Sequence, residues 1–170
     1  MSNVSKQRWG QSFKKGRRTE ERFTRAQPGC IKSSREDDIN KHIDFYFGES
    51  SVDVKGDNML DEIWVEIKNV RGENGWLFGE AEWIAFDMPE LQGFACVKRV
   101  DLVELVKEVV DKVYTTKAKA YRKLYQRKDR EDVITLLVHR DIRSIPSYMV
   151  MKYSMEYKDP LSGETIKANG

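Results

Sequence analysis

The sequence predicts an α/β domain built around a mixed β-sheet. Three observations support this prediction: short runs of β-branched and aromatic residues recur, two segments have helical character, and polar or glycine-rich turns separate them. With 170 residues, of which 39% are hydrophobic, the chain is long enough to bury the core of one domain. We expect a flexible basic arm at residues 1–16, a single domain at 17–156 and a polar tail at 157–170.

The first part of the chain predicts one helix and one β-hairpin. Residues 17–26, RRTEERFTRA, favour a short helix that has Thr19 as its N-cap and stops before Pro28. The segment 42–47, HIDFYF, is rich in β-forming residues, and the segment 51–55 alternates polar and apolar residues after a short turn. These two segments are therefore expected to pair as an antiparallel hairpin.

The rest of the chain predicts further strands and a second helix. Four apolar runs are expected to be strands: residues 62–70, 82–87, 94–99 and 133–138. From Asp101 onward, apolar residues recur at helical spacing, so this segment predicts a helix that packs on the core. Residues 112–130, between this helix and the last strand, contain eight Lys or Arg residues and one Asp.

The composition excludes several classes of protein. No apolar run reaches the about 18 residues of a membrane span, and the basic N-terminus lacks the apolar core of a secretory signal, so a cytoplasmic protein is expected. Cys30 and Cys96 are far apart, and His42 and His139 are isolated, so neither a zinc site, a disulfide framework nor a His-based triad is expected. The phosphate-binding motif GxxxxGK[ST] is absent, which predicts no dependence on ATP.

Charge is strongly segregated along the chain, although the formal net charge is only +2. The net charge is +8 over residues 1–35, −12 over 36–111 and +6 over 112–170. An acidic centre between basic arms is typical of a site that holds a divalent cation next to a surface for a polyanion such as DNA. In the alternative interpretation, these charges only form solvated faces.

Acidic and basic side chains occur together on three of the predicted strands. Asp44 lies in the first strand, and one face of the second carries Asp53 and Lys55. One face of the third carries Glu66 and Lys68. If these strands are adjacent, the carboxylates converge and require a shared cation, for which Mg²⁺ is suited and Mn²⁺ is a substitute. A lysine that orients or activates water then completes a site for metal-assisted phosphodiester hydrolysis.

These residues resemble the PD-(D/E)XK nuclease superfamily, which includes restriction enzymes, repair nucleases and phage junction-resolving endonucleases. The resemblance covers about residues 17–110, and the run WVEIKNVRGENGWLFGEAEWIAFD is similar to small phage-encoded members. It implies a restriction-endonuclease-like core, with a mixed central β-sheet flanked by helices, and a phage-encoded protein that acts in the host cell. Asp44 matches the first Asp of the family motif, and Asp53 and Lys55 match its acidic-x-Lys pair. Glu20 or Glu21 matches the glutamate of the first helix, whereas Ile43 replaces a proline before the first Asp.

A second register remains open, with Asp53 as the first acid and Glu66 with Lys68 as the acidic-x-Lys pair. In either register Asp53 is a metal ligand. In the first register Glu66 is an additional metal ligand or a structural partner of Lys55. A competing interpretation places all five residues on the solvated face of an antiparallel sheet, where the lysines form cross-strand ion pairs.

The basic segments contain the candidate contacts to a DNA backbone, which are Lys14, Lys15, Arg17, Arg18, Lys117, Lys119, Arg122, Lys123, Arg127 and Lys128. Tyr121 and Tyr125 lie among the second group. Aromatic residues near the glycine-rich loop are candidates for base stacking, although such residues more often pack in a core; they are Trp76, Phe78, Trp83 and Phe86.

The sequence therefore predicts a Mg²⁺-dependent endodeoxyribonuclease that acts on duplex or branched DNA, the junction substrate being implied only by the resemblance. A homodimer is expected if the enzyme cuts two strands symmetrically. No membrane partner is expected. One alternative is a non-catalytic nucleic-acid-binding protein with a degenerate nuclease fold, and another is an interaction module whose segregated charge serves assembly.

Overall fold

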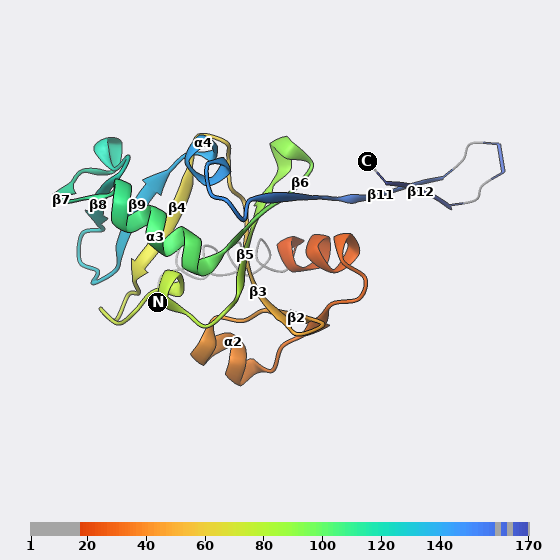
Figure 1. Ribbon diagram of the computed structural model, residues 1–170, viewed down its shortest axis with the longest axis horizontal. Helices are drawn as coiled ribbons and strands as arrows, with labels where there is room; N and C mark the ends of the chain where they lie inside the picture. The colour runs from red at the N-terminus through yellow and green to blue at the C-terminus, as the bar shows by residue number, and fades with distance from the viewer. Residues whose placement is uncertain (1–17, 159–160, 163–164, 170) are drawn as a thin grey trace, which may run out of the picture.

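The computed structural model describes residues 18–158, 161–162 and 165–169. Within this part of the chain, a six-stranded and a four-stranded β-sheet form the main body together with short helices (Figure 1). Most neighbouring strands are antiparallel, but β3 pairs in parallel with β5, and β7 with β8. The predicted α/β class with mixed strand directions is confirmed, although the strands form two main sheets.

The strands of the larger sheet are, in spatial order, β1 (Ile31–Lys32), β2 (Phe45–Phe47), β3 (Ser50–Lys55), β5 (Trp83–Met88), β6 (Gly93–Lys98) and β10 (Met149–Lys152). Those of the smaller sheet are β4 (Ile63–Lys68), β9 (Val133–Leu137), β8 (Lys123–Gln126) and β7 (Asp111–Thr115). A separate hairpin of β11 (Ser154–Lys158) and β12 (Thr165–Asn169) projects from the main body in Figure 1.

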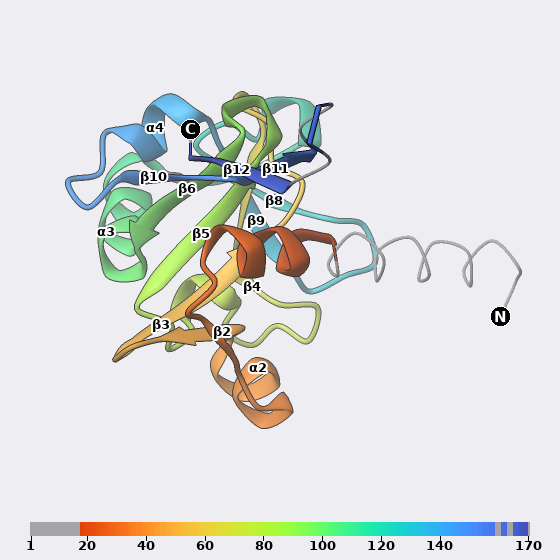
Figure 2. The same ribbon diagram turned by 90° about the vertical axis from the view of Figure 1, so that its right-hand side faces the viewer.

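The described helical elements are residues 18–26, α2 (Arg35–Lys41), α3 (Arg99–Val109) and α4 (His139–Arg143), with the short 3-10 helices η1 (Trp76–Phe78), η2 (Pro89–Leu91) and η3 (Lys117–Lys119). Figures 1 and 2 both place α2 beside β2 at the lower end of the larger sheet, below the helix of residues 18–26. No helix in the described part of the chain is long and apolar enough to cross a membrane.

Strand β5 organises the core because both of its faces are buried. Ile84 and Phe86 belong to one apolar cluster, which also contains Ile63 of β4 and Leu102 of α3. Ala85 faces a second cluster that packs against the helix of residues 18–26. A strand that is apolar on both faces favours a central position, which explains why β5 lies between β3 and β6.

The helix of residues 18–26 is attached to the larger sheet by packing and by a buried carboxylate. Phe23 stacks on Phe45 with ring centroids 5.0 Å apart. Asp87 of β5 is fully buried and accepts hydrogen bonds from Thr19, Arg22 and Tyr153. Its charge is balanced by the guanidinium of Arg22.

Several sequence predictions are confirmed and others need correction. The helix near residues 17–26, the hairpin of β2 and β3, and the strands β4, β5, β6 and β9 are present, and α3 begins two residues before Asp101. The short elements α2, α4, β1 and β10 were not predicted. The basic segment 112–130 contains β7, η3 and β8, and the expected polar tail contains the β11–β12 hairpin. The predicted basic arm at residues 1–16 lies outside the described residues.

Candidate active site

Two buried carboxylates meet where β2 and β3 pair. Asp44 immediately precedes β2 and is 9% exposed, and Asp53 in the middle of β3 is 2% exposed. The Asp44 amide donates to the carbonyl of Val52, and its Oδ2 accepts a 2.7 Å hydrogen bond from the amide of Val54. Since Asp53 lies between these two valines, the backbone itself holds Asp44 against Asp53.

The alternation of β3 directs Asp53 and Lys55 away from the cluster that buries Val52 and Val54. Lys55 Nζ lies 2.8 Å from Asp53 Oδ1, so the two side chains form an ion pair along one face of the strand. The same Nζ lies 5.0 Å from the ring centroid of Trp76, a cation–π distance. Lys55 is therefore held between a carboxylate and an aromatic face, and its side chain remains 26% exposed.

The expected adjacency of three carboxylate-bearing strands is wrong, because β4 belongs to the smaller sheet and pairs with β9. The strand that pairs with β3 on the side opposite β2 is β5. Glu66 of β4 nevertheless lies near enough to raise the pKa of Lys55, behind the larger effect of Asp53. Its Oε1 accepts a hydrogen bond of 3.3 Å from the Trp76 amide. Glu66 thus approaches the site from the second sheet.

A close backbone approach brings η1, and with it Trp76, to β4. The Gly75 amide donates to the carbonyl of Ile67 at 2.9 Å. A Cβ atom at Gly75 would lie 2.6 Å from the backbone oxygen of Glu66, a distance that real side chains do not tolerate. Glycine is required here because the two backbones are in contact.

Lys68, the lysine of the alternative register, is exposed and lies at the irregular end of β4.

Two residues of the site were missed from the sequence, Asp38 in α2 and His42 at its C-terminal end. The side chain of Ser34 caps α2 by accepting from the Asp37 amide, and His42 ends it with φ of 54°. Burial and the Asp44 carboxylate raise the pKa of Asp38, while burial and then Lys55 lower that of His42. The pattern Ser34-x-x-Asp37 is a helix-start signal that would have identified α2.

The helix glutamates predicted for the site lie elsewhere. Glu20 forms an ion pair with Lys32, the Oε1–Nζ distance being 2.9 Å. Both Glu20 and Glu21 line a hollow that includes Lys32 and Phe45, on the helix of residues 18–26. Neither forms a hydrogen bond or ion pair with Asp44 in the described part of the chain. The carboxylate that reaches Asp44 from a helix is therefore Asp38.

The electrostatics of the two central carboxylates favour an additional positive ligand. Burial, followed by the charge of Asp53, raises the pKa of Asp44 to about 6. Burial also raises the pKa of Asp53, against the opposing effect of Lys55. Oδ2 of Asp53 is buried and has no hydrogen-bond partner among the described residues. A buried carboxylate oxygen without a donor is costly, so this atom has the capacity to accept a cation or a proton.

The described residues contain no group of three or more His, Cys, Asp or Glu side chains that could hold a metal ion. Mg²⁺ does not need one, because it uses one or two carboxylates and keeps water or phosphate oxygens as its other ligands. The unpartnered oxygen of Asp53 and the adjacent Asp44 carboxylate fit this requirement. The donor set is therefore compatible with a magnesium ion that is completed by substrate.

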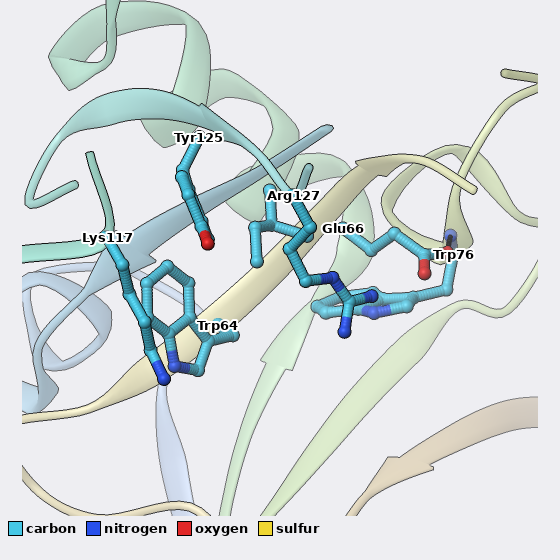
Figure 3. A pocket seen from close by; sticks show the side chains of 7 residues that line it. Trp64, Glu66, Trp76, Lys117, Tyr125 and Arg127 are labelled. Carbon is cyan, nitrogen blue, oxygen red and sulfur yellow. Dashed lines mark hydrogen bonds between the residues drawn. The ribbon is translucent and has the colours of Figure 1, made fainter. Parts of the chain in front are cut away.

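A cavity of about 340 Å³ lies on the smaller sheet, and Glu66 and Trp76 form part of its lining (Figure 3). Its lining residues are Trp64, Glu66, Trp76, Lys117, Tyr125, Arg127 and Ile134. Glu66 and Trp76 are therefore shared between the cavity and the surroundings of Lys55. In Figure 3, Trp64 and Glu66 rise from β4, and Tyr125 of β8 and Arg127, the residue after β8, face them.

Some of the predicted DNA contacts are engaged in ion pairs within the protein. Arg122 pairs with the buried Asp141, and Arg127 pairs with the buried Asp132. Lys117, Lys119 and Lys128 are exposed, Lys123 is half-buried, and Arg18 is exposed at the start of the described chain. Lys14, Lys15 and Arg17 lie outside the described residues.

The four aromatic residues considered for base stacking have different environments. Phe86 is fully buried in the core, and Trp76 is buried beneath Lys55 with one edge on the cavity. Trp83 is half-buried, and Phe78 is exposed. The sequence analysis did not single out Trp64, which lines the cavity and contacts Tyr125 with ring centroids 6.1 Å apart.

Comparison of this chain with protein-family models, curated proteins and solved structures finds no match.

Proposed function

We propose that this protein is a Mg²⁺-dependent endodeoxyribonuclease of the PD-(D/E)XK type. The observation that supports the proposal most strongly is the buried Asp53 carboxylate, which has one oxygen paired with Lys55 and the other without a partner beside Asp44. A carboxylate pair and a lysine on one hairpin are the groups that metal-assisted phosphodiester hydrolysis requires. Asp44, Asp53 and Lys55 thus correspond to the family motif to which the sequence is similar.

Asp44 and Asp53 would hold the metal, with Glu66 and Asp38 near enough to adjust the local charge. When bound, Mg²⁺ or Mn²⁺ would lower the pKa of a coordinated water and neutralise charge on the phosphate. Between the two carboxylates, Asp44 has the higher affinity for a proton in the metal-free protein, since Asp53 has Lys55 as its counter-charge.

Lys55 acts in this proposal as a positioned cation. Burial lowers the pKa of Lys55, but the carboxylates of Asp53, Asp44 and Glu66 together outweigh this effect and raise it, so Nζ stays protonated at neutral pH. In hydrolysis the water oxygen bonds to phosphorus, a P–O bond to one sugar breaks, one water proton passes to solvent and the leaving oxygen takes up a proton. Nζ is suited to donating hydrogen bonds to the attacking water and to a phosphate oxygen.

The surface of the smaller sheet supplies positive charge for the DNA backbone. Lys117 and Lys119 are exposed on η3, and Lys128 follows β8. Phosphate contacts of this kind fix the position of the substrate and do not depend on base sequence. Arg122 and Arg127 have internal carboxylate partners, so we assign them first to holding β8 against its surroundings.

The experiment that tests this function is cleavage of labelled DNA in Mg²⁺, Mn²⁺ or EDTA. The substrates are a linear duplex, a single strand, a flap and a four-way junction. We expect cutting only with a divalent metal, and loss of cutting in both Asp53→Asn and Lys55→Ala. The matched control is Lys107→Ala, which removes an exposed lysine on α3 that pairs only with Glu104.

Metal-independent binding without cutting of any substrate would contradict the nuclease and support the non-catalytic DNA-binding protein. Retention of cutting in Asp53→Asn would show that the activity does not arise at this site. Preference for the junction or flap would identify the branched-DNA subclass, and dimerisation on the junction would be expected with symmetric cuts.

A further inference from the structure

A second hollow shares Trp64 with the cavity between β4 and β8, and Lys55 itself is part of its lining. This second hollow has a volume of about 280 Å³ and is lined by Lys55, Gly56, Asp57, Asn58, Met59, Glu62 and Trp64. Trp64 lines both spaces, and Lys55 contacts Trp76 of the first. The side chains of Trp64 and Trp76 therefore link Lys55 to the cavity between β4 and β8.

The walls of the larger cavity are aromatic and cationic. The ring centroids of Trp64 and Tyr125 lie 6.1 Å apart and the ring planes are tilted by 46°, so no third ring fits between them. A planar ligand would therefore stack on one exposed face. Lys117 supplies positive charge at the lining, where the guanidinium of Arg127 is paired with Asp132. Figure 3 shows these side chains surrounding one open space. Aromatic faces combined with cations are the groups that bind single-stranded nucleic acid.

Glu66 is the one acidic residue of the lining. A carboxylate would repel a phosphate, but it accepts hydrogen bonds from the amino group on a base edge. The cavity therefore suits a base pointing inward more than a phosphate. Its volume of about 340 Å³ lies at the lower end of the roughly 300–1,000 Å³ of small-molecule pockets, which fits a single base-sized group.

We propose that this cavity holds one unpaired nucleobase of the DNA substrate, next to the phosphodiester bond that the carboxylate site cuts. This inference rests on the proposed nuclease function and specifies its substrate as DNA with a single-stranded or extrahelical nucleotide. In a continuous duplex both faces of a base are covered by its neighbours, so stacking on Trp64 requires a base that has left the helix.

The test is binding of two DNA duplexes by fluorescence anisotropy in EDTA, where no metal-dependent cutting occurs. One duplex is fully paired, and the other is identical except for one extrahelical cytosine. We expect the wild-type protein to bind the second duplex about tenfold more tightly, the size of effect that one stacked base supplies. The Trp64→Ala variant should lose this preference, and Trp64→Phe should keep most of it because an aromatic face remains.

The matched control is Tyr114→Ala, which removes a tyrosine of the same sheet that is 57% exposed and does not line the cavity. This variant should keep the preference. Equal affinity of the wild-type protein for the two duplexes would overturn the inference, as would an unchanged preference in Trp64→Ala. Thermal unfolding of each variant separates loss of the cavity from loss of the fold.

The two proposals fail in different ways. If the preference for the extrahelical base is present but no DNA is cut with Mg²⁺ or Mn²⁺, the nuclease proposal fails and the base cavity remains. If metal-dependent cutting occurs without any preference, or at sites unrelated to the extrahelical base, the cavity inference fails alone.

Discussion

The larger sheet buries carboxylates in two contrasting ways. Asp87 of β5 has both oxygens occupied, since it accepts hydrogen bonds from Thr19, Arg22 and Tyr153. Asp53 of β3 has one oxygen paired with Lys55 and the other without a partner in the described chain. Both oxygens of Asp87 therefore have donors within the protein, whereas one oxygen of Asp53 has the capacity to accept a ligand.

We propose that this difference, together with the Asp44 carboxylate beside Asp53, distinguishes a structural acid from a functional one. A satisfied buried ion pair connects elements, and Asp87 connects the helix of residues 18–26 to β5. A partly unsatisfied pair of carboxylates reduces stability in the free protein, and such a cost is typical of binding and catalytic sites. In the proposed nuclease, the same amino acid in the same sheet has opposite roles, because the neighbours that donate to it differ.

The largest expected effect comes from Asp53→Asn, which changes only the charge of the functional carboxylate. We expect the metal-dependent cleavage rate to fall about 10²–10³-fold or more, because a ligand and charge at the reacting phosphate are lost. The free energy of unfolding should stay within about 1 kcal/mol of wild type or increase, because a buried charge is removed and Lys55 keeps Asp44 and Glu66 as counter-charges. Single-turnover cleavage and urea unfolding measure the two quantities. A large loss of stability would place Asp53 with Asp87 as a structural residue.

The same chemical change at Asp87 should have the opposite outcome. Asp87→Asn removes the counter-charge of Arg22, which is only partly exposed, and weakens the bonds from Thr19 and Tyr153. We expect the free energy of unfolding to fall by about 2–3 kcal/mol. The cleavage rate of the protein that remains folded should change little. Urea unfolding followed by circular dichroism tests the first expectation, and a rate normalised to folded protein tests the second.

The dependence of stability on pH distinguishes the two regions further. The folded-state pKa of Asp44 is about 6, above the value of about 3.9 for an unperturbed Asp. The folded protein therefore binds this proton more tightly than the unfolded chain, and the resulting stability is lost as pH rises through about 6. In EDTA, the unfolding free energy of Asp44→Asn relative to wild type should increase by roughly 1–3 kcal/mol between pH 4 and pH 7.

Urea unfolding at several pH values measures this difference. Asn is neutral at every pH and keeps an oxygen that accepts from the Val54 amide, so the variant retains the local hydrogen bond. A constant difference between variant and wild type across this range would contradict the elevated pKa of Asp44. Added Mg²⁺ should reduce the difference at pH 7 if the carboxylates hold the ion.

The smallest expected effect on the cleavage rate compares an acid of α2 with an acid of the helix of residues 18–26. Asp38→Asn should reduce the cleavage rate about tenfold, the lower range of losses when a group next to a metal ligand is changed. Glu20→Gln should leave the rate within about twofold, because Glu20 pairs with Lys32 away from Asp44. Steady-state cleavage of one duplex substrate compares both variants directly. A larger loss of cleavage rate in Glu20→Gln than in Asp38→Asn would support a role in the site for Glu20, the helix glutamate that the family resemblance implies.

The local parts of the candidate site follow from patterns in the amino-acid sequence. The alternation in SVDVK placed Asp53 and Lys55 on one face and the two valines on the other, because successive residues in a strand point to opposite faces. The short turn after Phe47 paired β2 with β3, which brought Asp44 beside Asp53. These features depend on residues close together in the chain.

The distant groups that join these local parts were brought to them by packing between separate elements. Glu66 approaches from the smaller sheet, Asp38 comes from a short helix, and Trp64 shares a cavity with Tyr125 of β8. Pairing between distant strands depends on how apolar faces pack, and β5 took the place beside β3 because it is buried on both faces. The pattern within β4 was visible in the sequence, but its membership of the second sheet followed from packing alone.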